Sequence, residues 1–345
     1  MKIVVVGSQG TLGHELVRSW NDPFVEARIA AQLGVAPVSG EDRIVALNLP
    51  DFDACARLAA IETLCEFQPD VIVNAAGVNL IDWLESRPNT ARTLHEQGPA
   101  NLREAAKRCG ALLMQYSCGE VFYRSRLEQG VVDKRERAET PEKARSLVRA
   151  FDDQSRLDLP VSPDAPGFDE TTVPNPASVY AKTKLESERV ASEAPEYLIL
   201  RFSALFGEST QFSSGNLVES LFNAFRRAKR VSAISDRVVE PLWALDVLCA
   251  TKTLIRRKVR GLFHLTGGSR GTPEEVARFL LPKLDFPDRQ VSGVTTAEYG
   301  VSAPYSSFTV LSSNRYDEID GLYRVPSWQT ALIDFLEWRR RKTAS

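Results

Sequence analysis

The chain opens on an apolar run, residues 2–6, that leads directly into three glycines, Gly7, Gly10 and Gly13. A short β-branched run with no charge after its first residue is typical of a parallel strand buried on both faces. The first glycine allows a tight turn, the second lets a phosphate approach the backbone, and the third lets a helix pack closely on the sheet. The helix that follows presents unpaired N–H groups and a partial positive charge. The pattern predicts a dinucleotide site formed by Gly7, Gln9, Gly10, Thr11, Leu12 and Gly13.

Segments with the patterns of strands and helices alternate along most of the chain. The expected strands are residues 2–6, 71–73, 111–116 and 197–202, and the expected helices are residues 12–20, 98–108, 179–194 and 327–341. Such alternation predicts an α/β fold with a Rossmann-type doubly wound parallel sheet and right-handed crossovers. We expect this NAD(P)-binding domain in residues 1–205. A smaller C-terminal α/β substrate lobe, interleaved with the sheet, is expected in residues 206–345.

Two stretches interrupt this alternation. Residues 22–44 contain more chain than a link between a helix and a strand requires, and we place the second strand within them, at residues 35–38. Residues 124–167 are rich in charge and poor in periodicity, which predicts a surface insertion or lid within the first domain. A solvated loop is the simpler interpretation of this insertion. A contact with substrate or with another subunit is the alternative.

The residue that meets the adenosine ribose is expected just after the second strand. An acidic residue at this point favours NAD, whereas an arginine favours NADP. The sequence offers both kinds of residue, so NAD and NADP both stay open as the cofactor, with a slight preference for NADP(H). The candidates are Ser39, Glu41, Asp42 and Arg43.

Charge and cysteine content exclude several other classes of protein. The 43 lysines and arginines nearly balance the 45 aspartates and glutamates, so there is no basic excess to bind a nucleic-acid backbone. No apolar run approaches the roughly 18 residues that span a bilayer, and the first residues have no signal-peptide layout. The five cysteines have no metal-ligand spacing, which predicts no metal site and reduced thiols in a cytoplasmic protein. A homodimer stays open.

A tyrosine and a lysine four positions apart, Tyr180 and Lys184, lie on one of the expected helices. This spacing places both side chains on the same helical face. A free tyrosine has a pKa of about 10 and is a poor acid-base group at neutral pH. A neighbouring ammonium, together with an oxidised nicotinamide, stabilises the phenolate and lowers this pKa. The pair therefore predicts a proton donor for a carbonyl that accepts a hydride, and an exposed pair on a solvated helix is the alternative.

Five further segments share a pattern with one family of enzymes. They are residues 74–77, 98–102, 174–186, 201–207 and 325–329. Together with the glycine motif, they resemble the dTDP-4-dehydrorhamnose reductases of the extended short-chain dehydrogenase/reductase superfamily. The resemblance covers most of the chain, except residues 22–44 and 124–167.

The resemblance implies a reductase that delivers a hydride from NAD(P)H to the keto carbon of a nucleotide sugar. It also implies roles for individual residues. Tyr180 would be the acid, and Lys184 would lower its pKa and hold the cofactor ribose. Asn74, Ala75 and Ala76 would border the adenine side of the cofactor.

The residues after the strand at 111–116 depart from the family pattern. Relatives have Ser-Thr-Asp-Tyr-Val-Phe where residues 117–122 are Ser-Cys-Gly-Glu-Val-Phe. The hydroxyl that contacts the substrate carbonyl falls on Cys118, whose thiol is a weaker donor. Ser117 is the adjacent hydroxyl, although neighbours on a strand point to opposite faces; either residue is a candidate for the contact. His95 stands where many relatives have an asparagine that helps to place the lysine, and a structural role is the simpler interpretation.

Glu120 leaves a second reaction class open. Sugar-nucleotide dehydratases and decarboxylases of the same superfamily have a catalytic glutamate here, next to an acid that this chain replaces by Gly119. A two-carboxylate elimination would lack half of its acid-base pair. The first alternative function is thus a dehydratase, decarboxylase or epimerase that recycles bound NAD. The second is a catalytically weak NAD(P)-binding regulatory subunit, which the changes at Cys118 and His95 favour.

The second lobe follows the family outline only in part. Within residues 236–246, Glu240 and Trp243 are the candidates for lining the sugar or base pocket. Trp243 fits a core position equally well.

Overall fold

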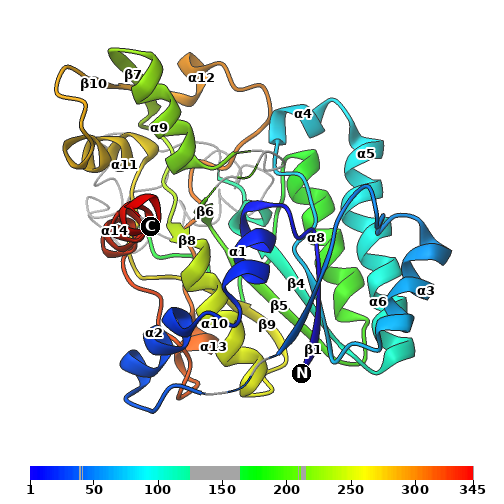
Figure 1. Cartoon of the computed structure of the whole chain (residues 1–345). Coiled ribbons are helices and arrows are strands. Elements are labelled where there is room, and N and C mark those ends of the chain that lie inside the picture. The colour runs from blue at the N-terminus through cyan, green and yellow to red at the C-terminus, as the bar shows by residue number, and fades with distance from the viewer. Residues whose placement is uncertain (39, 41, 125–163, 209, 211–214, 345) are drawn as a thin grey trace, which may run out of the picture.

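The computed structural model describes residues 1–38, 40, 42–124, 164–208, 210 and 215–344. The strands of its central sheet are β1 (Lys2–Val6), β2 (Arg43–Leu47), β3 (Val71–Asn74), β4 (Leu112–Cys118), β5 (Tyr197–Phe202) and β9 (Gly261–His264). All six pair in parallel, in the order β2-β1-β3-β4-β5-β9 (Figure 1). This parallel sheet confirms the predicted α/β fold.

Helices cover both faces of the sheet. One face carries α3 (Arg57–Phe67), α6 (Gly98–Cys109) and α8 (Val179–Ser192), and the other carries α1 (Thr11–Ser19) and α10 (Ala244–Arg256). Because successive side chains of a strand point to opposite faces, β1 feeds two cores. Ile3 and Val5 pack in the core beneath α1 and α10, and Val4 and Val6 pack beneath α3 and α6. Burial on both faces explains why this strand carries no polar residue after Lys2.

The segment after β5, which we call the C-terminal segment, contains two small parallel sheets. They pair β7 (Arg230–Ile234) with β10 (Gln290–Val294), and β6 (Ala204–Phe206) with β8 (Pro241–Trp243). The helices that pack on these strands are α9 (Leu217–Arg227), α11 (Pro273–Leu280) and α14 (Trp328–Ala344). The same segment supplies β9 and α10 to the central layers, so its residues are interleaved with the main sheet (Figure 1).

Shorter helices connect these elements. They are α2 (Pro23–Leu33), α4 (Ile81–Glu85), α5 (Pro88–Arg92), α12 (Thr296–Tyr299) and α13 (Asn314–Asp317), with a π-helical turn η1 (Thr93–Gln97) and 3-10 turns η2 (Gly119–Val121) and η4 (Leu281–Lys283). Residues 125–163 of the expected insertion, like the ribose candidates Ser39 and Glu41, lie outside the described residues. Among the described helices, none combines the length and the apolar character needed to cross a bilayer.

The prediction of a second strand at residues 35–38 is wrong. Helix α2 fills the extra chain and ends at Gly34, whose φ of 65° is left-handed and stops the helix. The residues that follow are exposed, and Pro37 among them has no N–H to donate to a strand partner. The second strand is β2, which pairs in register with β1 from Arg43 opposite Lys2 onwards.

This shift places the two described ribose candidates at the wrong edge of the sheet. Asp42 and Arg43 lie at the amino end of β2, whereas cofactors bind at carboxyl ends. Asp42 accepts hydrogen bonds of 2.9 Å from both the Met1 ammonium and the Trp20 indole. The residue that follows β2 at its carboxyl end is Asn48.

The strand order reverses at β1, because the chain goes from β1 to β2 on one side and returns to β3 on the other. Open α/β sheets bind ligands in the crevice that such a reversal opens at the carboxyl ends of the strands. Gly7 follows β1 at this edge, and its N–H donates to the carbonyl oxygen of Leu47 at 2.9 Å. Asn74 ends β3 at the same edge. The fold therefore brings the glycine motif and Asn74 to one crevice.

Candidate active site

The loop after β1 forms the turn that its glycines predict. Gly7 has φ of 81°, and a Cβ there would lie 2.4 Å from the backbone nitrogen of Ala76. A Cβ on Gly13 would lie 2.1 Å from the carbonyl oxygen of Gly7, so α1 packs this closely only because Gly13 has no side chain. A Cβ on Gly10 would meet its nearest neighbour at 3.6 Å. Packing thus requires the first and third glycines, and the second leaves space open.

The amino end of α1 suits the pyrophosphate of a dinucleotide. Gly10 is the N-cap, and its helix receives no hydrogen bond from a capping side chain. Gly10, Thr11 and Leu12 line a cavity, so the N–H groups and the positive end of the helix dipole face a ligand space. Gln9 lies beside them, and its Oε1 accepts a 2.8 Å hydrogen bond from Nδ2 of Asn48. These features fit the predicted cofactor.

Asn74 shapes the other wall of the crevice. Its Nδ2 donates to Oε1 of Gln115 at 2.7 Å, and its Oδ1 accepts from the N–H of Ala76 at 3.1 Å. Both side-chain groups of this buried residue are therefore occupied in holding the turn after β3. Asn74, Ala75 and Ala76 all line the cavity; that they border the adenine side of the cofactor stays a prediction.

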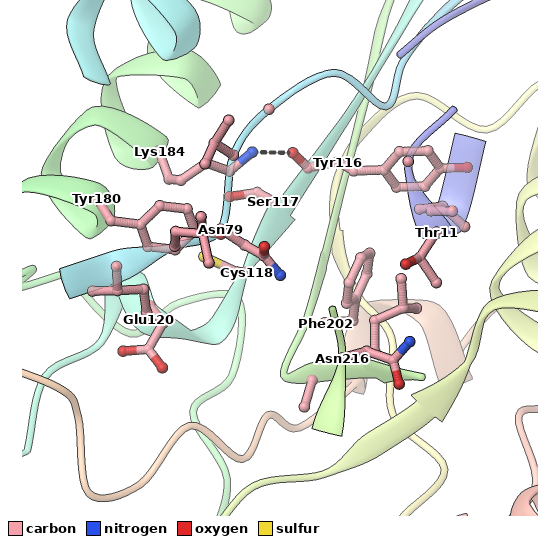
Figure 2. A pocket seen from close by; sticks show the side chains of 18 of the residues that line it. Thr11, Asn79, Tyr116, Ser117, Cys118, Glu120, Tyr180, Lys184, Phe202 and Asn216 are labelled. Atoms are coloured by element: carbon pink, nitrogen blue, oxygen red, sulfur yellow. Dashed lines mark hydrogen bonds between the residues drawn. The ribbon is translucent and has the colours of Figure 1, made fainter. Parts of the chain in front are cut away.

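The cavity has a volume of about 540 Å³ and lies between the carboxyl ends of the sheet and the C-terminal segment. Figure 2 shows Tyr180, Cys118 and Glu120 on one side of it. Thr11, Phe202 and Asn216 lie on the other side in this view (Figure 2). The cavity therefore joins the glycine loop to the expected catalytic residues.

Helix α8 brings the tyrosine and the lysine to this cavity. Oγ of Ser178 accepts a 3.1 Å hydrogen bond from the N–H of Ala181, which fixes where the helix begins. Tyr180 and Lys184 follow on one face, and both are buried and line the cavity. Nζ of Lys184 donates to the carbonyl oxygen of Tyr116 at 2.7 Å (Figure 2).

Burial governs the charge states of this pair. It raises the pKa of Tyr180 well above its ordinary value, and Cys118 raises it further. Arg237 lowers this pKa but does not offset the burial. Burial lowers the pKa of Lys184, whereas Cys118 and Glu188 raise it. The phenol therefore stays protonated here, which suits a proton donor; the lowering of its pKa expected from Lys184 together with an oxidised nicotinamide stays a prediction.

The two candidates for the carbonyl contact are used differently. Cys118 is buried in one cluster with Tyr180, and burial raises the pKa of its thiol to about 11, so the thiol is neutral. Ser117 also lines the cavity, but its hydroxyl donates to Oε1 of Glu188. The structure therefore places the Cys118 thiol, and not the Ser117 hydroxyl, against the phenol.

His95 enters the site from the π-helical turn η1. Such turns are often found at functional sites. Its Nδ1 shares a 2.9 Å hydrogen bond with Oγ1 of Thr183, and its ring meets that of Tyr180 edge-on at 5.6 Å between centroids. Burial lowers the pKa of His95 to about 3, and the charge of Lys184 adds to this effect. The imidazole is therefore neutral at physiological pH.

Glu120 lines the cavity as half of an ion pair with Arg237. Its second oxygen accepts a 3.3 Å hydrogen bond from the N–H of Ser306. The Arg237 guanidinium also stacks on the ring of Tyr305, 4.9 Å from the centroid. The carboxylate is therefore anchored to the C-terminal segment, and its charge is balanced.

A known protein family matches most of the chain. The family model described as the RmlD substrate binding domain matches residues 1–132 and 151–340. The chain belongs to this family.

Relatives of the RmlD substrate-binding family extend over most of the chain. The dTDP-4-dehydrorhamnose reductase of Salmonella typhimurium is 26% identical over 324 residues, covering 91% of this chain and 87% of the relative. Methionine adenosyltransferase 2 subunit beta of Xenopus tropicalis is 24% identical, covering 87% and 77%. The crystal structure of the dTDP-4-dehydrorhamnose reductase of Bacillus anthracis in complex with NADP matches with a TM-score of 0.76 and 20% identity, covering 98% and 99%. This last likeness shows a common fold.

Two residues expected to contact substrate do not reach the cavity in this member of the RmlD substrate-binding family. Trp243 is fully buried in the core, with its ring centroid 5.8 Å from that of Phe335. Glu240 is also buried and accepts hydrogen bonds from the Thr266 hydroxyl and from the N–H of Gly267. Neither lines the cavity: Glu240 precedes β8, Trp243 ends it, and both side chains are buried in the interior.

Sequence reasoning also missed residues that line or border the site in this family member. Asn216, Arg237 and Tyr305 line the cavity from the C-terminal segment. Arg237 lies within residues 236–246, where the sequence favoured Glu240 and Trp243 instead, and no recognised motif surrounds Asn216 or Tyr305. Asn48 had a usable signal, since it follows the short apolar run that forms β2. The misplaced strand concealed it.

Proposed function

We propose that the chain is an NAD(P)-dependent reductase of a keto-sugar nucleotide. Its relatives include proteins named dTDP-4-dehydrorhamnose reductase, one of which is solved in complex with NADP. One observation carries this proposal. The protonated hydroxyl of Tyr180 lies beside Cys118 in a cavity whose other wall is the glycine loop after β1. A proton donor and a dinucleotide cradle in one cavity suit the reduction of a carbonyl group.

When bound, NAD(P)H supplies the hydride. The N–H groups at Gly10 and the start of α1 hold the pyrophosphate, and the ammonium of Lys184, already oriented by the carbonyl of Tyr116, holds the ribose. Tyr180 gives its phenolic proton to the carbonyl oxygen of the substrate. Cys118 donates a weak hydrogen bond to the same oxygen.

The remaining surface of the cavity supports a nucleotide sugar as the substrate class. Polar side chains that can meet sugar hydroxyls line it on both sides of the sheet edge. They are Asn79, Glu120, Asn216, Ser220 and Arg237.

The structure disfavours the elimination catalysed by superfamily dehydratases. Such a reaction needs an acid at position 119, and a Cβ on Gly119 would lie 2.4 Å from the carbonyl oxygen of Thr309. An aspartate there would require the backbone of the C-terminal segment to move. Glu120 is held by Arg237 and has no carboxylate beside it at position 119 to complete an acid-base pair.

A catalytically weak cofactor-binding subunit is the second candidate. The thiol of Cys118 favours it, because a poor donor replaces the hydroxyl next to the phenol. The similarity to methionine adenosyltransferase 2 subunit beta, a subunit by name, points the same way. The intact pair of Tyr180 and Lys184 favours the reductase.

The deciding experiment follows the absorbance of NADH and NADPH with a panel of dTDP-, UDP- and GDP-keto sugars. We expect one reduced dinucleotide to be consumed for each hydroxyl formed. Tyr180→Phe should lower kcat by about 10²–10⁴-fold and leave the dinucleotide Kd unchanged. Tyr299→Phe, an exposed tyrosine, is the matched control. Product without net consumption of the dinucleotide indicates an enzyme that recycles bound NAD. Dinucleotide binding without turnover of any keto sugar indicates the cofactor-binding subunit.

Cofactor choice gives a second prediction. We propose that Asn48, a neutral amide at the carboxyl end of β2, accepts both NAD(H) and NADP(H), with NADP(H) slightly favoured. Asn48→Asp should shift the ratio of the two dissociation constants towards NADH by about tenfold, because the new charge repels a ribose phosphate. Fluorescence titration measures this ratio, with Asn89→Asp on α5 as the control. An unchanged ratio in Asn48→Asp would place ribose recognition elsewhere.

A further inference from the structure

A buried ion pair lies directly behind the cavity wall. Glu188 of α8 and Arg201 of β5 have side chains that are 4% and 5% exposed. Nη2 of Arg201 donates to one carboxylate oxygen at 2.5 Å, and Nε donates to the other at 2.8 Å. This bidentate arrangement fixes both side chains in one geometry. A buried ion pair is costly unless its remaining donors and acceptors also have hydrogen-bond partners, so the groups around Glu188 and Arg201 decide its stability.

His264 of β9 holds the far side of the arginine. Nη1 of Arg201 lies 3.2 Å from Nε2 of His264. Because a guanidinium can only donate, Nε2 must be the acceptor of this hydrogen bond. Nδ1 of His264 then carries the proton and donates to the carbonyl oxygen of Phe168 at 2.9 Å. Burial lowers the pKa of His264 to about 4, so this ring is neutral. The arginine is therefore held between a neutral acceptor and the carboxylate.

The near side of the carboxylate reaches the candidate active site. Ser117 pairs in register with Arg201 across β4 and β5, and its hydroxyl donates to Oε1 of Glu188. Cys118 follows Ser117 directly. Lys184 precedes Glu188 by four residues on α8, so the two side chains share one helical face. The network thus ties together the elements that carry the phenol, the thiol and the ammonium.

Titratable groups from three elements act on Lys184. They are Cys118 of β4, His95 of η1 and Glu188 of α8. The thiol and the imidazole are neutral at physiological pH, so Glu188 is the anion among them. Burial lowers the pKa of Lys184, and Glu188 opposes this effect. The carboxylate thus helps a buried ammonium to keep its proton, while Arg201 takes up the rest of its charge.

We propose that Glu188 is a positioning residue. Its carboxylate holds the Ser117–Cys118 end of β4 in the arrangement needed for reduction, and its negative charge acts on the Lys184 ammonium one helical turn away, which itself donates to the carbonyl of Tyr116. Arg201 and His264 orient its carboxylate. The proposal rests on the proposed function, but it acts through dinucleotide binding, which can be measured without turnover.

The test is the pH dependence of NADH and NADPH affinity in Glu188→Gln, measured by fluorescence titration on the full chain. The amide keeps the size of the side chain and removes its charge. Lys184 should then lose its proton at lower pH, so the pH above which affinity falls should move down by about one unit, a tenfold loss in the shifted range. At about pH 6, where an ammonium remains protonated in both proteins, affinity should agree within about twofold.

Further variants separate positioning from stability. Glu188→Gln leaves Arg201 as a buried cation with only neutral partners, so the double variant Glu188→Gln with Arg201→Gln tests the pH shift without that charge. Asp246→Asn is the matched control, because Asp246 pairs with Arg28 in a buried ion pair outside the cavity lining. It should lower the melting temperature without moving the pH profile.

Each outcome supports or overturns the proposal. A downward shift of the profile in both Glu188 variants supports it, and so does partial recovery in Glu188→Asp. A loss of affinity that is equal at every pH, or equal to that of Asp246→Asn, overturns it. If the shift occurs but the wild-type protein reduces no keto sugar, the positioning role stands and the proposed reaction fails. If keto sugars are reduced and the pH profile does not move, the proposed reaction stands and the positioning role of Glu188 fails.

Discussion

Cys118 is the residue whose chemistry departs most from the expected reaction. Its thiol occupies the place of a hydroxyl beside Tyr180, and at a pKa of about 11 it stays neutral. Cys118→Ser supplies a stronger neutral donor of similar size. We expect kcat/KM for a keto sugar to rise by about three- to tenfold, since a hydrogen bond stronger by about 1 kcal/mol gives this ratio.

The control for this variant is Cys249→Ser, which alters a buried thiol in the core beneath α1. It should lower stability and leave kcat/KM unchanged. A fall in kcat/KM in Cys118→Ser, with an unchanged melting temperature, would show that the thiol itself serves the reaction.

The sequence identified the residues of the site that belong to local patterns. Tyr180 and Lys184 are candidates from their helical spacing, and Cys118 is a candidate from the family resemblance of residues 117–122. Tyr305 could not be found, and Arg237 was passed over within residues 236–246, because only the packing of the C-terminal segment brings Arg237 to Glu120 and Tyr305 to Arg237. Burial could not be predicted either, and it raises the pKa of Tyr180.

At the scale of elements, the glycine loop and α1 give a paired prediction. Gly13→Ala forces a Cβ to within 2.1 Å of the Gly7 carbonyl, so α1 must move away from β1. We expect a loss of about 1–3 kcal/mol in the free energy of unfolding and loss of dinucleotide binding. Urea titration and fluorescence titration measure the two effects.

Gly10→Ala is the companion variant. Its Cβ would meet nothing closer than 3.6 Å, so the free energy of unfolding should be close to that of the wild type. Because Gly10 lines the cavity, dinucleotide affinity should still fall. Equal loss of stability in the two variants would contradict the distinct roles of the two glycines.

Elements with strong periodicity were predictable, and those set by tertiary packing were not. The expected helix at residues 98–108 is α6, and it stops at Gly110 in the left-handed conformation. The second strand was misplaced because residues 35–38 contain two valines, as a strand would. Gly34 ends α2 just before them, which the sequence reading did not recognise as a helix stop.

At the scale of the molecule, His264 of β9 makes the stability of the fold depend on pH. Its ring joins Arg201 of β5 to the backbone at Phe168. Its pKa is lowered from 6.5 to about 4, chiefly by burial. A lowered histidine pKa stabilises the fold above the unfolded value, and this contribution is lost as pH falls from about 6.5 towards 4. His264→Gln removes that dependence. We expect its deficit in unfolding free energy to shrink by about 2 kcal/mol between about pH 7 and pH 4.5.

Urea unfolding of both proteins at the two pH values measures this difference. The comparison with wild type cancels other titrating groups, including Glu240, whose pKa burial raises to about 7. A deficit that stays constant across the range would show that folding does not lower the pKa of His264.

The late position of β9 has a consequence for how the molecule is made. β5 gains its outer neighbour only when Gly261–His264 have left the ribosome, some sixty residues after β5 itself. Until then the growing polypeptide exposes an unpaired apolar edge, which is a site for aggregation. Such distant pairing also slows folding. Nascent chains that pause before residue 261 should therefore be the species that chaperones engage.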